Sequence, residues 1–148
     1  MFTLRFLLAV LHLFALAIGL AAVYGRGRAL RGLKDATGLG GVFHADNWYG
    51  VAAVTWILTG LLRAFGGLEK GTEYYLESHW FVGKLTLFGL VLVLELKPMI
   101  TLIRWRMQLR KGLTPDLSSA PRLARLTFAQ VPLLVLMVLM AAAMARGL

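Results

Sequence analysis

The amino-acid sequence contains four long blocks of apolar residues separated by short polar connections, and this pattern constrains the fold more than any other feature. A soluble helix or strand spaces its apolar residues along one face, whereas these blocks are nearly continuous. Each block approaches the roughly 20 residues that a helix needs to cross a hydrocarbon core of about 30 Å. The chain of 148 residues is 59% hydrophobic, above the roughly 45–50% of soluble domains.

The four blocks predict an integral membrane protein that is all-α. Because the connections are short, neighbouring helices should run antiparallel, as in a four-helix transmembrane bundle. We expect a single transmembrane domain over residues 1–148, with helices at about residues 4–24, 47–65, 79–106 and 122–145.

The ends of the blocks carry residues typical of helix boundaries. Asp46 or Asn47 can cap the second helix, and Ser78 the third, because a short side-chain oxygen accepts from the first free backbone N–H groups. Asp46 has the alternative of pairing with an arginine of the first connection. Pro98 predicts a kink, and Glu95 is expected at the membrane interface.

Basic residues gather beside two of the three connections. The chain has 16 Lys and Arg against 7 Asp and Glu, a net charge of +9. The first and third connections hold most of the Lys and Arg, so the positive-inside rule puts them in the cytoplasm and both termini outside. Anionic lipid headgroups are therefore the expected partner of these connections, within a lipid bilayer. No nucleic-acid motif accompanies the charge, and the lack of cysteine excludes disulfides and thiolate metal sites.

Three ionisable residues fall inside the apolar blocks, where each costs roughly 2.5–3.5 kcal/mol on insertion scales and is a functional candidate. His12 can ligate haem iron or another metal, or relay protons; alternatively it hydrogen-bonds Thr55 or Thr59. Lys84 can hold a carboxylate or phosphate, or extend its ammonium to the outer interface.

Arg63 can grip a carboxylate in two places, contact a lipid phosphate, or pair with Glu69 or Glu73. With antiparallel neighbours, His12, Arg63 and Lys84 all fall in the outer half of the bundle. We therefore predict a cofactor site there, with His12 as its metal ligand.

A set of short motifs lies along the first three predicted helices and their connections. It consists of His12; Asp46, Tyr49 and Gly50; Thr59, Gly60 and Arg63; Lys70, Gly71 and Tyr74; Phe81 and Lys84; Pro98; and Trp105 and Arg106. In these residues the chain resembles a family of small four-helix bacterial membrane proteins known as domain of unknown function 2214. The resemblance implies the inner membrane of a bacterium.

More remotely, the chain is similar to haem-containing protoporphyrinogen oxidases and copper-resistance D-type membrane proteins. Those place a His in the first helix and a Lys after a Trp in a later helix, here His12, Trp80 and Lys84. The similarity implies a b-type haem or porphyrin with His12 as axial ligand and with Arg63 and Lys84 near the propionates.

Three functions are consistent with the sequence. The first is a b-type haem or porphyrin protein, with an oxidoreductase as one form of this hypothesis. The second is a small transport or metal-handling component. The third is a structural or accessory subunit of a membrane complex, which would partner another membrane protein or a second copy of this chain.

Overall fold

The computed structural model describes residues 2–67 and 72–146, and within them the chain forms four long helices. These are α1 (Phe2–Arg31), α2 (Leu39–Phe65), α4 (His79–Arg110) and α5 (Ala120–Arg146). A short 3-10 helix, η1 (Ala36–Gly38), precedes α2, and a short helix α3 (Thr72–Glu77) precedes α4. All four long helices are apolar and long enough to cross a membrane. The predicted four-helix membrane bundle is thus confirmed.

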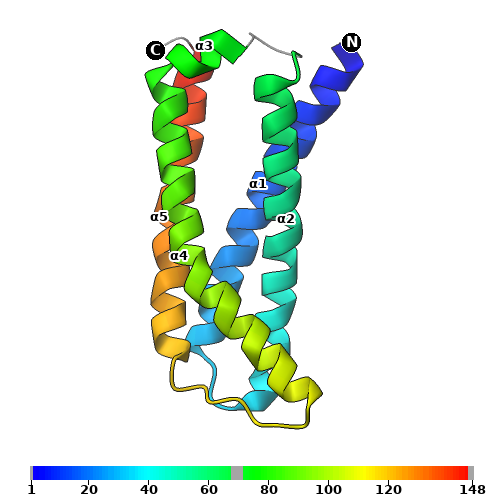
Figure 1. The fold of residues 1–148 in the computed structure, drawn as a ribbon, viewed down its shortest axis with the longest axis vertical. Coiled ribbons are helices and arrows are strands. Elements are labelled where there is room, and N and C mark those ends of the chain that lie inside the picture. The colour runs from blue at the N-terminus through cyan, green and yellow to red at the C-terminus, as the bar shows by residue number, and fades with distance from the viewer. Residues whose placement is uncertain (1, 68–71, 147–148) are drawn as a thin grey trace.

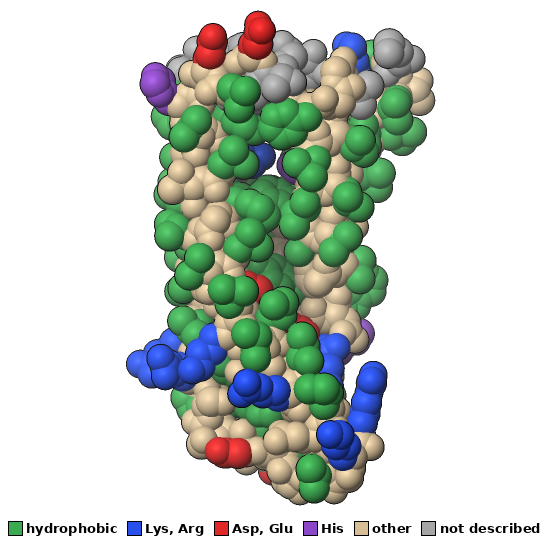
Figure 2. Space-filling model, in the orientation of Figure 1, with side chains coloured by type: hydrophobic (Ala, Val, Ile, Leu, Met, Phe, Trp, Pro, Cys, Tyr) green, Lys and Arg blue, Asp and Glu red, His purple; other side chains and the backbone are tan. Residues whose placement is uncertain are grey.

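The long helices run antiparallel, so both chain ends lie at one end of the bundle, together with α3 (Figure 1). We call this the termini end. The connections after α1 and α4 lie at the opposite end, where Lys and Arg side chains form a band (Figure 2). We call this the basic end. Between the two ends the surface is rich in exposed Leu, Val and Phe side chains, as contact with lipid requires.

Packing between the helices is uneven. Helix α1 packs against α2 and α5, and α4 packs against α5, whereas contact between α2 and α4 is sparse at most. At the basic end a large apolar cluster joins all four helices around Leu30, Leu102 and Leu123. At the termini end the core cluster of described residues is reduced to Ala64 and Phe81, with Met144 packed against them. The bundle is therefore tightly packed at the basic end and loosest near the chain termini.

The helices extend further at the basic end than the sequence predicts. Helix α1 has 30 residues and is about 45 Å long at 1.5 Å per residue, so it exceeds a hydrocarbon core of about 30 Å. Most of the predicted first connection is helical, which puts Arg26 inside α1. The prediction that Asp46 or Asn47 caps the second helix is wrong, because α2 already begins at Leu39. The N-cap residue of α2 is Gly38, which offers no side-chain hydrogen bond. Asp35 caps the preceding η1, where its side chain accepts from the backbone N–H of Thr37.

Helix α4 contains Pro98, which is buried and lies inside the helix. Figure 1 shows that α4 changes direction along its length, and a proline supplies the physical cause because it lacks an N–H and crowds the preceding turn. Ser78 occupies the N-cap position of α4 as predicted, but its side chain makes no capping hydrogen bond. Helix α4 continues to Arg110, beyond the predicted end at about residue 106.

Candidate functional site

His12, Arg63 and Lys84 line one cavity of about 470 Å³ near the termini end. They come from α1, α2 and α4, respectively. The rest of the wall is apolar or small. It is formed by Ala9, Leu13, Leu16, Trp56, Gly60, Ala64, Phe81, Met137, Val138, Ala141, Ala142, Met144 and Ala145. No carboxylate is among the described residues that line it. The three residues that the sequence singled out are thus together, in the loosely packed part of the bundle.

His12 is 8% exposed, and its Nδ1 lies 2.9 Å from the hydroxyl of Thr59. The Thr59 Oγ1 also lies 2.7 Å from the carbonyl oxygen of Thr55, which can only accept. The threonine hydroxyl proton is therefore committed to that carbonyl, so His12 donates from Nδ1–H to Thr59. The neutral ring then carries its lone pair on Nε2. The expected hydrogen bond to Thr59 is present, and it engages Nδ1 of the ring.

One turn of α2 contacts the imidazole ring of His12 on several sides. The His12 ring stacks on Trp56, with ring centroids 5.2 Å apart and planes 18° apart. A Cβ added at Gly60 would lie 3.3 Å from Cε1 of His12, so glycine makes room for the ring. Arg63 follows one turn later and faces the same cavity. The motif Thr59-Gly60-x-x-Arg63 therefore supplies the hydrogen bond, the space and a cation at one place.

Lys84 is half-buried, and its Nζ lies 5.2 Å from the ring centroid of Trp56. This is a cation–π contact of the kind that tryptophan makes best. Within the described part of the chain, no carboxylate forms an ion pair with Lys84. The ammonium thus lies beside the cavity wall. The alternative that Arg63 pairs with Glu69 falls on a residue, Glu69, that lies outside the described ranges.

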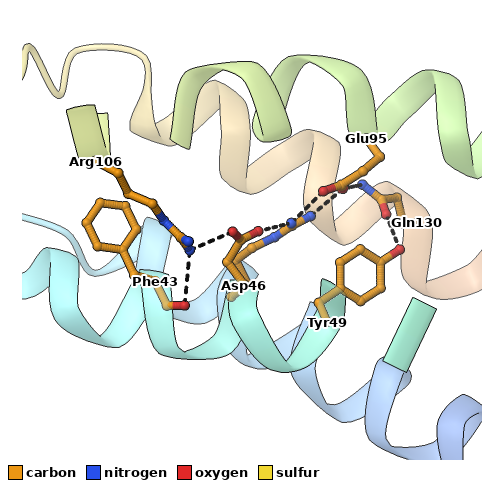
Figure 3. Close-up of polar contacts among 7 residues, drawn as sticks. Phe43, Asp46, Tyr49, Glu95, Arg106 and Gln130 are labelled. Carbon is orange, nitrogen blue, oxygen red and sulfur yellow. Dashed lines mark hydrogen bonds and ion pairs between the residues drawn. The ribbon is translucent and has the colours of Figure 1, made fainter. Parts of the chain in front are cut away.

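A second polar cluster lies nearer the basic end and joins the four long helices (Figure 3). Arg26 of α1 is 0% exposed and binds Glu95 of α4 through both guanidinium nitrogens, Nη1–Oε1 at 2.7 Å and Nη2–Oε2 at 2.5 Å. Its Nη1 also donates to Asp46 of α2 at 2.8 Å. Arg106 donates to the other Asp46 oxygen at 2.8 Å. These two cations and two carboxylates sum to zero charge.

Two polar neighbours, Gln130 and Tyr49, extend this ion-pair network by hydrogen bonds. Gln130 of α5 donates to Glu95 at 2.8 Å and accepts from the hydroxyl of Tyr49 at 2.7 Å. The guanidinium of Arg26 lies 4.8 Å from the ring centroid of Tyr49. Such a network holds four helices in one register, because its partners cannot exchange without leaving a buried charge unpaired.

The sequence pattern did not predict this network, apart from the alternative that Asp46 pairs with an arginine of the first connection. Arg26 was assigned to that connection and Glu95 to the interface. A signal was present, because small residues recur at helical spacing on the face of α1 that carries His12. The buried residues His12, Ala15, Gly19, Ala22, Arg26 and Leu30 follow this spacing. Extending the period from His12 would have placed Arg26 on the buried face.

Many of the motif residues that carry the family resemblance lie in one of the two clusters. Thr59, Gly60, Arg63 and Lys84 belong to the cavity, whereas Asp46, Tyr49 and Arg106 belong to the network. Lys70 and Gly71 lie outside the described residues.

The chain belongs to the family of predicted membrane proteins DUF2214, whose family model matches residues 4–148. The match therefore includes α5, which carried no motif in the sequence comparison. Neither a curated protein nor a solved structure matches the chain.

Proposed function

We propose that this membrane protein binds an amphipathic anion in the cavity at the termini end, and that the ligand is a porphyrin, bound as b-type haem. One observation carries the proposal: a histidine and two cations from three different helices line one cavity whose other walls are apolar. A porphyrin matches this arrangement, because it combines a flat apolar ring with two carboxylates and, in haem, an iron atom.

The size and chemistry of the cavity fit the group. A volume of about 470 Å³ lies within the roughly 300–1,000 Å³ typical of pockets for small organic ligands. The indole Nε1–H of Trp56 is buried and has no acceptor among the described residues. A buried donor without a partner calls for an acceptor from outside the chain. The described residues contain no group of three or more side chains that could hold a metal ion, which disfavours metal handling without a porphyrin.

Each polar residue then has a separate role. His12 would ligate the iron through Nε2, while its Nδ1–H bond to Thr59 fixes the ring orientation, the usual arrangement for a ligating histidine. Lys84 and Arg63 would hold the carboxylates. Bound haem would supply one-electron chemistry at its iron.

We also propose that the basic end faces the cytoplasm and that the membrane is the bacterial inner membrane. The support is the position of Lys and Arg at the basic end, as the positive-inside rule expects. The cavity would then lie in the outer half of the bilayer.

Titration of the detergent-purified protein with haemin and with metal-free protoporphyrin IX tests these roles. Wild-type protein should bind both, and haemin should give a shifted Soret band. His12→Ala should weaken haemin binding and leave the metal-free ring nearly unaffected, because only iron needs the imidazole lone pair. Lys84→Met should weaken both by about tenfold or more, since a hydrogen bond to a charged group contributes roughly 1.5–3 kcal/mol.

The matched control is Lys97→Met, because Lys97 lies on the same helix, is exposed and is remote from the cavity lining. Its affinities should equal those of the wild type. Absence of saturable binding of either ligand to the wild type would refute the proposal. If His12→Ala lost affinity for haemin and for the metal-free ring equally, the proposal that His12 ligates iron would be wrong, and His12 would have a packing role.

A further inference from the structure

A slot of about 100 Å³ opens between α2 and α4 and joins the cavity. Slot and cavity share a set of lining residues: His12, Trp56, Gly60, Ala64, Phe81 and Lys84. The remaining slot residues are all apolar. They are Ile57, Leu61 and Phe65 from α2, and Leu85 and Phe88 from α4. The slot exists because α2 and α4 make sparse contact at most, each being held in the bundle by other helices.

The slot opens sideways, through the flank of the bundle. Leu61 and Leu85 border it and are about half exposed, at 51% and 49%, and they lie on helices apolar enough to span a membrane. Figure 2 shows Lys or Arg and His atoms recessed between the two helix columns below the termini end. The polar groups of the cavity are therefore visible from a face that lipid would cover.

An ammonium that faces hydrocarbon is costly, roughly 2.5–3.5 kcal/mol on insertion scales. Lys84 lines this opening and has no carboxylate partner among the described residues. The contact with the Trp56 ring offsets part of this cost, and an anionic group in the opening would offset more of it. A flat amphiphile dissolved in the bilayer can supply that group, because its ring remains among apolar side chains while its carboxylates approach Lys84.

We propose that the ligand reaches the cavity laterally, from the bilayer leaflet at the termini end, through the slot between α2 and α4. This inference rests on the proposed function, and it restricts the ligand to amphiphiles that partition into lipid. Uptake is then limited by passage between two helices, and the water-facing ends of the bundle play no part in it.

The absence of native cysteine allows a clean test. Leu61→Cys and Leu85→Cys place a thiol on either border of the slot, and a bulky maleimide attached there obstructs it. The control is Val82→Cys, because Val82 is a similarly exposed residue of α4 at 51% that does not line the slot. Each labelled protein is reconstituted into phosphatidylcholine vesicles. These are mixed with protein-free vesicles that were preloaded with protoporphyrin IX, and uptake by the protein is followed by porphyrin fluorescence.

Labelling at Leu61→Cys or Leu85→Cys should slow uptake by about tenfold or more, and labelling at Val82→Cys should change it by less than about twofold. The slowing should appear in both association and release, with the dissociation constant nearly unchanged, because an obstructed path alters rates and leaves the bound state intact. Unchanged uptake at both slot positions, with normal binding, would overturn lateral access and retain the proposed function. Absence of binding in the unlabelled wild type would refute the proposed function itself.

Discussion

Arg26→Met should be among the most destabilising single substitutions in this chain. The guanidinium is fully buried and donates three hydrogen bonds to two carboxylates. Methionine keeps most of the apolar length but removes every donor. Glu95 is then left with the single donor Gln130, whereas Asp46 retains Arg106.

The magnitude follows from what each carboxylate loses. Removing one partner of a buried ion pair costs roughly 3–5 kcal/mol. Glu95 and Asp46 keep some solvent contact, with side chains 16% and 21% exposed, so the lower end applies, about 3 kcal/mol. At roughly 2–4 °C per kcal/mol for a chain of this size, the unfolding midpoint should fall by about 6–12 °C.

The assay is thermal unfolding of purified variants in one detergent. Lys97→Met removes an exposed cation from α4 and should stay within about 0.5 kcal/mol of the wild type. The double variant Arg26→Met with Glu95→Met should recover most of the loss, because replacing both partners by apolar groups removes the stranded charge. A midpoint for Arg26→Met within about 1 °C of the wild type would refute this account. So would a double variant as unstable as the sum of the two single ones.

Two further predictions concern the membrane topology and the contact of Gly60 with the His12 ring. Reporter fusions at Gly71 and Pro115 should report opposite compartments, with Pro115 cytoplasmic; the same compartment at both sites would contradict the four-span topology. Gly60→Ala should weaken haemin binding, because the new Cβ would stand 3.3 Å from Cε1 of His12 and the ring must move by a few tenths of an ångström. Gly50→Ala is the control, since a Cβ there meets nothing within 4 Å. It should leave binding unchanged and be neutral or stabilising by up to about 1 kcal/mol. Equal haemin affinities in the two variants would show that Gly60 does not position the ring.

Hydropathy was sufficient to predict the bundle, because burial in lipid requires long apolar runs whatever the packing within the bundle. It failed at the basic end, where the helices continue beyond the apolar blocks. The polar stretch after Gly25 was assigned to a connection, although the backbone stays helical to Arg31. Hydropathy reports where lipid can be, and it does not report where a helix ends once its charged side chains are paired with neighbouring helices.

The three ionisable residues of the cavity could each be predicted from the sequence. The sequence also placed them in the same half of the membrane, but it did not predict that they line one cavity. His12, Arg63 and Lys84 each stand out because ionisable residues are rare in apolar segments. Their convergence depends on which face of each helix turns inward. The low packing of α2 against α4, which produces the slot, leaves no mark in the sequence that a periodicity argument would detect.

Charge pairing separates the two polar clusters in function. In the network near the basic end, two cations meet two carboxylates, and every carboxylate oxygen accepts from an arginine. Gln130 adds a second donor to Glu95. Each charge there has a counter-charge, so the role of the network is to fix the register of the helices, although the Nε atoms of Arg26 and Arg106 are buried without a hydrogen-bond partner. The cavity differs in its charge balance, because its described lining has Lys84 but no carboxylate. The sequence alone does not distinguish a charge-balanced cluster from one with an excess of cations, since both consist of ionisable residues in apolar helices. The distinction requires the partner of each charge, and it is the reason why the cavity at the termini end, and not the ion-pair network, is proposed as the ligand site.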